Sequence, residues 1–490
     1  MTVKGFQMIW RIILFAFATA AYADYDCHVS LWRGESLSLL LPDEACEVSG
    51  EAPGIEVQTG TLLPVRYLAD NEALEYKTVA DRAVYGSKAP GVHFATIMAS
   101  RGADSGSYRF GNLVVTVVDR TLPPPREWKY YLDLWQHPWA VARVNGCEPF
   151  SPSHYKAMEP LWRQLADAGQ KTLTVTLVDR PWNKQCRDAY RSMVVRRKDA
   201  LGKWSFDYSR FDEYVVFGRA CGIGPHISCY TMCPWEYVVD YEGPDGTSVK
   251  MVAKPGSAEF DDYWHDFLED FERHLKEKGW LSDTYVAMDE RSPEDLDYIA
   301  KFVRRVAPGL KISVAGNRPL SAFAGIDIDS YSHSFRRMDD QFIRDILLRK
   351  RQGLITTYYV CCEPPRPNTF MGSGAGEAFV CSFYPVVLNL DGFLRWAYNS
   401  WGEDPLRDMT YRRWASGDTA LVYPDGSPSW RFLELKNGIQ QAEKFCILRD
   451  MGVRNDDLDE LRKMFVLRDI QSGTDYARLR DKVIEILNKK

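Results

Sequence analysis

Two adjacent carboxylates, Asp289 and Glu290, end a short stretch that is rich in strand-forming residues. The run Ser292 to Asp295 that follows is typical of the start of a helix, so the acid pair is expected where a strand becomes a loop. Neighbouring carboxyl groups repel, so one can hold a proton near neutral pH while the other is ionised. Acid–base cleavage of a glycosidic bond needs that division of roles. The pair could also be a surface Asp-Glu that favours the amino-terminal dipole of the following helix.

Eight strand-like stretches alternate with helical stretches beyond residue 128, including predicted helices at 153–169 and 260–278. Repeated strand–helix units predict parallel strands that close into a (β/α)8 barrel, with catalytic groups at the carboxyl ends of the strands. The acid pair would then lie at the mouth of this barrel. The predicted strands are 129–137, 171–179, 225–233, 283–290, 311–317, 326–332, 354–363 and 393–401.

Aromatic and polar residues recur near the carboxyl ends of these predicted strands. Aromatic faces stack on sugar rings and a few polar groups fix the hydroxyls, so the mixture favours a carbohydrate site. Each aromatic residue taken alone would more often belong to the core, and it is their occurrence together at strand ends that favours the site. The predicted substrate-binding residues are Trp135, His137, Trp182, Trp235, Asn317, Tyr331, Tyr359, Glu363, Trp396, Tyr398 and Trp401.

The length of 490 residues and a hydrophobic content of 45% predict more than one domain. Short β-like runs separated by turn clusters indicate an amino-terminal β-sandwich over residues 24–122. The Pro-rich linker 123–127 leads into the (β/α)8 TIM-type barrel, residues 128–449, and a helical extension follows over 450–490. The predicted fold class is therefore β plus α/β, with a sandwich, a barrel and carboxyl-terminal helices.

Charge and the amino terminus bear on partners and location. A net charge of -6 with dispersed Lys and Arg gives no basic stripe, so neither nucleic acid nor an anionic membrane is an expected partner. Residues 1–23 combine a positive start, a short apolar core and an Ala-x-Ala site, which predicts a signal peptide. The apolar run is short for a bilayer span, so no stable membrane insertion is expected. The predicted location is periplasmic or secreted.

Eleven cysteines leave at least one thiol unpaired. The first predicted domain contains two cysteines, Cys27 and Cys46. In an exported protein they could form a disulfide, or both could stay free thiols. The other nine, including Cys361 and Cys362, lack the spacing of a structural zinc site and are interpreted as mostly buried thiols. No metal site and no cofactor are predicted.

Three segments carry a resemblance to a known family: 359–370, the Trp-rich stretch 392–401 with Asp404-Pro405, and 417–424. Together with the Asp-Glu context they resemble glycoside hydrolase family 123, over roughly residues 128 to 445. Members are bacterial N-acetyl-β-galactosaminidases with an amino-terminal β-sandwich and a catalytic barrel. The resemblance implies a glycan or glycoconjugate substrate bearing terminal N-acetylgalactosamine. In relatives the acid pair is often followed directly by Pro, whereas here Arg291 and Ser292 intervene before Pro293.

The family resemblance also implies a mechanism in which the substrate's own acetamido oxygen attacks the anomeric carbon. Asp289 would stabilise the resulting oxazolinium charge, and Glu290 would act as general acid and then base. Two alternatives stay open. In the first, a retaining β-glycosidase uses Glu290 as acid–base and Glu363 as nucleophile. In the second, the aromatic mouth belongs to a carbohydrate-binding protein without catalytic activity.

Overall fold

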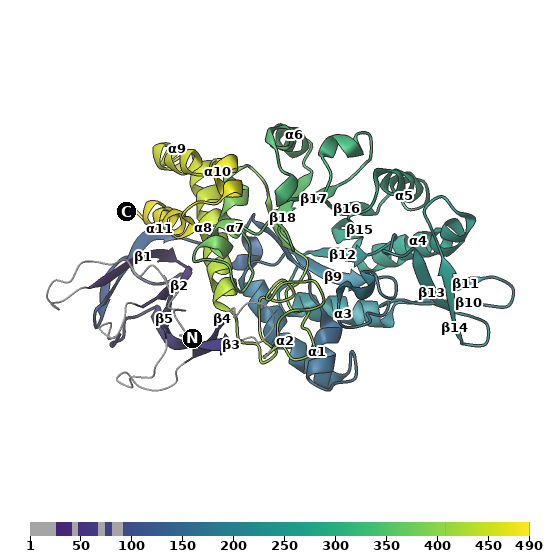
Figure 1. The fold of residues 1–490 in the computed structure, drawn as a ribbon, viewed down its shortest axis with the longest axis horizontal. Helices are drawn as coiled ribbons and strands as arrows, with labels where there is room; N and C mark the ends of the chain where they lie inside the picture. The colour runs from purple at the N-terminus through teal and green to yellow at the C-terminus, as the bar shows by residue number, and fades with distance from the viewer. Residues whose placement is uncertain (1–25, 42–47, 67–73, 81–91, 407, 490) are drawn as a thin grey trace, which may run out of the picture.

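The computed structural model describes residues 26–41, 48–66, 74–80, 92–406 and 408–489. A β-rich region, a bundle of carboxyl-terminal helices and a barrel follow one another along the long axis of the molecule (Figure 1). Residues 1–23 and Cys46 lie outside the described residues, so the signal peptide and the bridge between Cys27 and Cys46 stay predictions. Within the described ranges, no helix is both long and apolar enough to cross a bilayer.

The amino-terminal region contains two sheets, with strand orders β1-β7-β6 and β2-β5-β3-β4. Buried apolar side chains from both sheets, among them Leu31, Leu37, Ile97 and Val115, share one core, as the predicted sandwich requires. The strands are β1 (Cys27–Arg33), β2 (Ser36–Leu40), β3 (Ile55–Arg66), β4 (Leu74–Ala80), β5 (Val92–Ala99), β6 (Gly106–Phe110) and β7 (Leu113–Thr121).

Eight parallel strands form the barrel, in the order β8-β19-β18-β17-β16-β15-β12-β9. Each lies within or overlaps one of the eight predicted stretches, so the predicted barrel is confirmed. Alternate residues face the interior, which places consecutive layers of side chains beneath the mouth. The strands are β8 (Tyr131–Leu134), β9 (Thr172–Thr176), β12 (His226–Tyr230), β15 (Thr284–Asp289), β16 (Lys311–Gly316), β17 (Ser330–Ser334), β18 (Ile355–Tyr359) and β19 (Gly392–Arg395).

Two glutamine side chains complete the seam between β8 and β9, the end strands of this sheet. The amide of Gln170 accepts from Leu134 N at 3.0 Å and donates to Leu134 O at 3.1 Å. The amide of Gln136 accepts from Thr174 N at 2.9 Å and donates to Thr172 O at 3.2 Å. Both glutamines are buried, so their side chains satisfy backbone groups that would otherwise be costly to leave unpaired.

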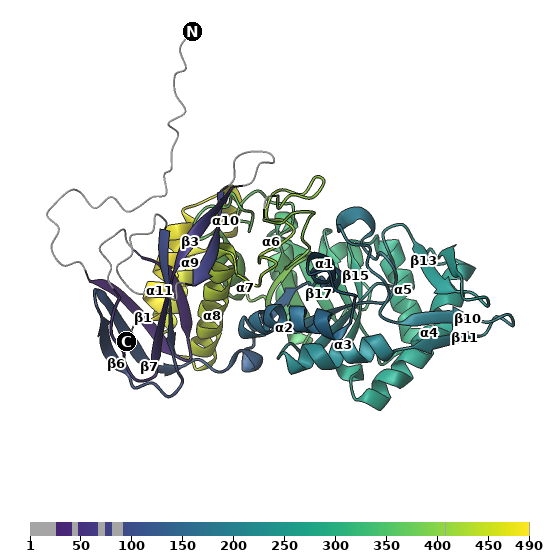
Figure 2. The ribbon, with the colours of Figure 1, turned by 90° about the horizontal axis from the view of Figure 1, so that it is seen from below.

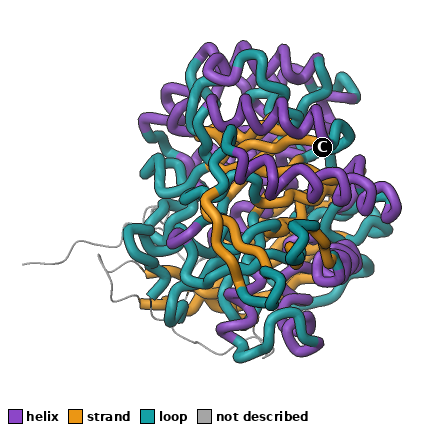
Figure 3. Tube along the Cα trace, turned by 90° about the vertical axis from the view of Figure 1, so that its right-hand side faces the viewer, coloured by secondary structure: helices purple, strands orange, loops and turns teal. Residues whose placement is uncertain are grey.

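Helices surround the barrel strands, and a view along the long axis shows them outside the strands (Figure 3). A short 3-10 turn, η4 (Leu320–Phe323), takes the place of an α-helix between β16 and β17. The helices are α1 (Pro138–Val144), α2 (Pro152–Asp167), α3 (Ser209–Ala220), α4 (Ala258–Lys278), α5 (Pro293–Val306), α6 (Asp340–Arg351), α7 (Glu377–Val387), α8 (Trp430–Asp450), α9 (Asn455–Met464), α10 (Leu467–Ser472) and α11 (Tyr476–Leu487).

A second sheet extends the barrel domain at the end far from the amino-terminal region (Figure 1). Its strand order is β11-β10-β13-β14, and its strands lie outside the eight predicted ones. The strands come from two insertions, one before α3 and one before α4: β10 (Val195–Lys198), β11 (Trp204–Asp207), β13 (Val238–Glu242) and β14 (Ser248–Val252).

Helix α8 joins the amino-terminal sheets to the barrel domain (Figure 2). Its Lys444 forms an ion pair with Glu35, and both side chains are fully buried. Asn437 of the same helix accepts from Ser38 N at 3.1 Å and donates to Ser38 O at 2.7 Å, as a neighbouring strand would. The predicted helical extension over 450–490 contains three helices among its described residues, α9, α10 and α11, and Gly473 with φ 96° ends the second of them.

Candidate active site

Asp289 is the last residue of β15, and Glu290 is the first residue beyond it. Consecutive side chains of a strand point to opposite faces, which alone would separate the two carboxyl groups. Glu290 instead adopts φ 49°, a conformation that is uncommon for a residue other than glycine, while its N–H donates to Ala315 O at 2.8 Å. Both carboxyl groups therefore line the same cavity at the barrel mouth.

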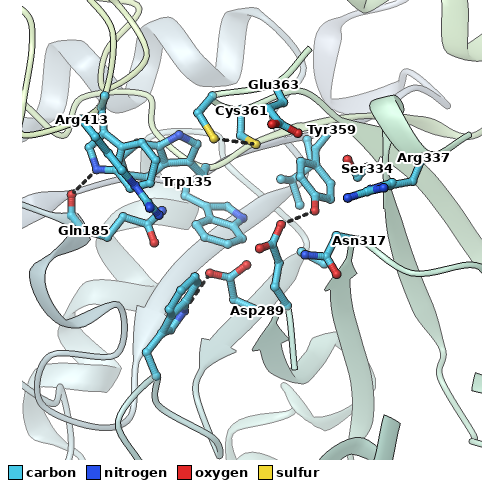
Figure 4. A pocket seen from close by; sticks show the side chains of 17 residues that line it. Trp135, Gln185, Asp289, Asn317, Ser334, Arg337, Tyr359, Cys361, Glu363 and Arg413 are labelled. Atoms are coloured by element: carbon cyan, nitrogen blue, oxygen red, sulfur yellow. Dashed lines mark hydrogen bonds between the residues drawn. The ribbon is translucent and has the colours of Figure 1, made fainter. Parts of the chain in front are cut away.

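Each carboxylate accepts a hydrogen bond from a different aromatic side chain (Figure 4). The indole N–H of Trp235 donates to Oδ2 of Asp289 at 3.2 Å. The hydroxyl of Tyr359, the last residue of β18, donates to Oε1 of Glu290 at 2.5 Å. Burial raises the pKa of Tyr359 well above its ordinary value, so its hydroxyl stays a neutral donor.

Burial has the largest influence on the protonation of Asp289. Only 9% of Asp289 is exposed, and burial followed by the charge of Glu290 raises the pKa of Asp289 to about 7. Arg291 and the Trp235 indole oppose that increase. Asp289 therefore keeps its proton to a higher pH than an ordinary aspartic acid. A carboxyl group with a strongly raised pKa inside a cavity is typical of a functional site.

The cavity has two connected parts. The inner part, of about 160 Å³, contains the acid pair, and the outer part, of about 410 Å³, is bordered by Trp182, Asn183, Lys184 and Arg412. The residues that border both parts are Gln185, Trp235, Arg413 and Trp414. The indole N–H of Trp414 donates to Gln185 O at 3.1 Å, which fixes this boundary. Aromatic walls with polar groups at a few points suit a sugar ring.

Six of the eleven predicted substrate-binding residues line the inner cavity, and a seventh, Trp182, lines the outer part. The indole of Trp182 stacks on that of Trp135, with ring centroids 5.4 Å apart. Trp135 and Trp396 are almost fully buried, so they form the floor and inner wall of the cavity. The six that line the inner cavity are Trp135, Trp235, Asn317, Tyr359, Glu363 and Trp396.

His137 and Tyr331, which are predicted to contact substrate, are not among the residues that line the cavity. His137 is fully buried; its Nδ1 contacts the Tyr190 hydroxyl and its Nε2 lies 2.9 Å from Trp396 O. Burial lowers the pKa of His137 to about 4, so it is a neutral support for Trp396. The hydroxyl of Tyr331 donates to Arg318 O at 2.9 Å, because β17 turns this side chain away from the barrel interior.

Tyr398 and Trp401 also lie outside the cavity, and both are fully buried. The predicted strand 393–401 is too long, because β19 ends at Arg395. Beyond that point the chain packs against residues 420–422. The hydroxyl of Tyr398 donates to Gln164 Oε1 at 2.7 Å, and the indole of Trp401 donates to Val422 O at 2.7 Å. Both residues therefore hold the loop after β19 in place.

Glu363 lies at the rim of the cavity, where its side chain is 47% exposed and pairs with Arg336. Figure 4 shows Cys361 and Glu363 near Tyr359, on the side of the cavity away from Asp289. Further lining residues were not predicted. Three of them, Ala315, Ser334 and Leu394, belong to barrel strands, and the others come from connections whose positions depend on contacts far apart in the sequence. The further lining residues are Gln185, Ser334, Arg337, Cys361, Cys362, Leu394, Arg413 and Trp414, together with Ala315.

One group of His and carboxylate residues in the described ranges is close enough to share a cation, namely His265, Asp266 and Glu269. All three are exposed on α4, outside the cavity. Exposed acidic groups of this kind are common without an ion, and this one takes no part in the site described above.

Comparison with known proteins places this site in a family. The model of the glycoside hydrolase 123 catalytic domain matches residues 135–448, more than half of the chain. A family 123 glycoside hydrolase from Clostridium perfringens, studied for glycolipid glycan hydrolysis, has a similar structure with a TM-score of 0.76 and 24% identity, over 94% of this chain and 92% of that one. The catalytic domain of a β-amylase from Paenibacillus polymyxa reaches a TM-score of 0.37 and 9% identity, over 64% of this chain and 98% of that one.

No curated protein sequence matches the chain. The family match covers the whole barrel mouth, including the acid pair, the Tyr359 strand and the Trp-rich stretch after β19. A glycosidase with a glycan substrate accounts for the aromatic cavity and for the paired carboxyl groups. The chain belongs to glycoside hydrolase family 123, and residues 135–448 are its catalytic domain.

Proposed function

We propose that the protein is an exported, exo-acting, retaining glycosidase that removes terminal β-linked N-acetylgalactosamine by substrate-assisted catalysis. The observation that carries this proposal is the pair of carboxyl groups in one small cavity, each with its own hydrogen-bond donor. Two adjacent residues can act together because the acetamido group and the glycosidic oxygen are attached to neighbouring carbons of the sugar. Export rests on the pattern of residues 1–23, and the galacto preference rests on the family resemblance.

Asp289 would accept the acetamido N–H and stabilise the positive charge that develops on the oxazolinium ring. The carboxyl group must be ionised for that role, although burial and the charge of Glu290 raise its pKa to about 7. A donated N–H bond favours the carboxylate, so substrate binding would release the proton from Asp289. Trp235 already donates one hydrogen bond to this carboxyl group, and that bond also favours the ionised form.

Glu290 would protonate the leaving oxygen and then deprotonate the attacking water. Its carboxyl group lines the cavity, and the hydroxyl of Tyr359 fixes the position of one oxygen. The acetamido oxygen would form the bond to the anomeric carbon while the glycosidic bond breaks. Water would then open the oxazolinium ring from the opposite face, so the two inversions give overall retention.

The rival reaction uses Glu363 as a direct nucleophile. That role requires a carboxylate placed beneath the sugar, ionised and free to attack carbon. Glu363 is instead half exposed at the rim, where it pairs with Arg336. These two observations favour the acetamido group as the nucleophile. A carbohydrate-binding protein without activity is the other alternative, and the aromatic wall by itself would suit it equally well.

Paired substitutions of the two acids test the proposal. Asp289→Asn and Glu290→Gln should each lower kcat by about two orders of magnitude or more, on a substrate whose leaving group needs protonation. Glu290→Gln should retain binding of the unhydrolysed glycan. Nuclear magnetic resonance of the first product should show the β-anomer. Wild-type rates in both variants would refute the roles, and a first-formed α-anomer would refute retention.

A further inference from the structure

Cys361 and Cys362 follow closely after β18, and both line the inner cavity. Their Sγ atoms are 3.8 Å apart. The proposed glycosidase reaction assigns no task to either thiol. Figure 4 shows Cys361 close to Tyr359, whose hydroxyl donates to Glu290. A chemical change at this pair of sulfur atoms would therefore alter the cavity wall beside the proposed acid–base.

The pair differs in accessibility from the other cysteines. Of the ten cysteines that the structure describes, six are buried, Cys27, Cys147 and Cys361 are partly exposed, and Cys362 is the exposed one. A dissolved reagent can reach Cys362 directly, and the partly exposed Cys361 lies next to it. Among the described residues, this is the thiol pair whose sulfur atoms are in contact.

The electrostatics of the pair favour an ordered reaction. The hydrogen bond with the Cys361 thiol lowers the pKa of Cys362 below its ordinary value. The same contact, followed by burial, raises the pKa of Cys361. Because the thiolate is the nucleophile, Cys362 would react first with an external reagent and Cys361 second.

The backbone around the pair is held firmly from behind. The buried side chain of Asn368 donates to Cys361 O at 3.0 Å and to Pro364 O at 2.6 Å. Arg395, also buried, donates to Val360 O at 3.1 Å. These anchors keep both sulfur atoms at the cavity wall.

We propose that Cys361 and Cys362 form a redox-modifiable dithiol site, which a low-molecular-weight disulfide converts into an internal disulfide in the cavity wall. The Cys362 thiolate attacks one sulfur of the reagent, forms a mixed disulfide and releases one reagent thiolate. The Cys361 thiolate then attacks Sγ of Cys362 and releases the second reagent thiolate. The two cysteine sulfurs lose two electrons to the reagent, and the two thiol protons end on the two released thiolates.

The resulting disulfide should be easy to reduce. The Cα atoms of adjacent residues are about 3.8 Å apart, which is below the range of about 4.4 to 6.8 Å that disulfides prefer. Strained disulfides have higher reduction potentials and act as labile or regulatory bonds. The site would therefore respond reversibly to the balance of thiols and disulfides around the protein.

Peptide mapping of the full chain tests the proposal without depending on the natural substrate. The reduced protein is exposed to oxidised glutathione, its free thiols are alkylated, and it is digested. The peptide with both cysteines should carry neither alkyl group nor glutathione and should have lost the mass of two hydrogen atoms. Dithiothreitol should restore both thiols. Unmodified thiols at the pair, when Cys147 has reacted, would overturn the proposal.

Three variants test the order of the two steps. Cys361→Ser should accumulate one stable glutathione adduct on Cys362, because the resolving thiol is absent. The reaction of Cys362→Ser with oxidised glutathione should be slower by about tenfold or more, because the accessible thiolate is gone. Cys147→Ser, which changes a cysteine outside the cavity, should behave as wild type. Faster modification of Cys362→Ser than of Cys361→Ser would refute the assigned order.

Activity gives a second readout, with each variant compared with its own untreated rate. Oxidised wild type should lose about fivefold or more in kcat/KM, and dithiothreitol should restore it, because the wall beside Tyr359 has moved. Cys361→Ser/Cys362→Ser should show no change on the same treatment. Complete internal oxidation with an unchanged kcat/KM would refute any effect of the site on the cavity.

Discussion

The indole N–H of Trp235 donates to Oδ2 of Asp289 at 3.2 Å. This hydrogen bond lowers the pKa of Asp289, whereas burial raises it. A hydrogen bond to a charged group is worth about 1.5 to 3 kcal/mol. Trp235→Phe keeps an aromatic wall but removes the donor. The pKa of Asp289 should therefore rise further above its ordinary value.

The consequence can be measured in the pH dependence of kcat/KM. The proposed reaction needs ionised Asp289, so wild-type kcat/KM should fall as the pH drops below about 7. In Trp235→Phe this acidic limb should move to higher pH, with a loss of about tenfold at pH 6 and a smaller loss at pH 8. Trp414→Phe is the matched control, because its indole donates to Gln185 instead. An acidic limb that stays in place in Trp235→Phe would contradict the role of this bond.

Glu363→Gln separates the proposed reaction from its rival. Because Glu363 is half exposed and paired with Arg336, its substitution should change kcat by less than about threefold. Arg336→Gln, which removes the other half of the ion pair, is the matched control and should behave alike. A loss of two or more orders of magnitude in Glu363→Gln alone, in steady-state kinetics, would identify Glu363 as the nucleophile.

The buried ion pair between Glu35 and Lys444 joins the amino-terminal sheets to α8. Lys444→Met leaves the carboxylate of Glu35 buried without its counter-charge, which should lower the free energy of unfolding by about 3 to 5 kcal/mol. Urea denaturation followed by far-UV circular dichroism measures this change. The double variant Glu35→Gln/Lys444→Met should recover part of the loss. A single variant as stable as wild type would show that the pair does not hold the two regions together.

The barrel could be predicted from the sequence because strand composition and helix periodicity repeat along the chain. The eight predicted stretches fall on its eight strands, and Asp289 falls at the end of β15. Errors arose where a strand end was misplaced. Tyr331 was predicted at the carboxyl end of a strand over 326–332, whereas β17 begins at Ser330 and turns that side chain outward.

Features that depend on distant contacts could not be predicted. The four strands of the side sheet come from two separate insertions, and neither insertion shows from its composition that it pairs with the other. Gln185 and Trp414 meet at the cavity boundary across more than two hundred residues. The exposed position of Cys362 was also missed, because a cysteine is more often buried.

The central claim is that the substrate's own acetamido group is the nucleophile. Its most direct test compares nitrophenyl N-acetyl-β-galactosaminide with nitrophenyl β-galactoside, which differ only in that group, with and without a galacto-configured thiazoline. The kcat/KM for the galactoside should be lower by about a thousandfold or more. The thiazoline should inhibit hydrolysis of the N-acetylgalactosaminide competitively. Similar turnover of both glycosides, unaffected by the thiazoline, would contradict it.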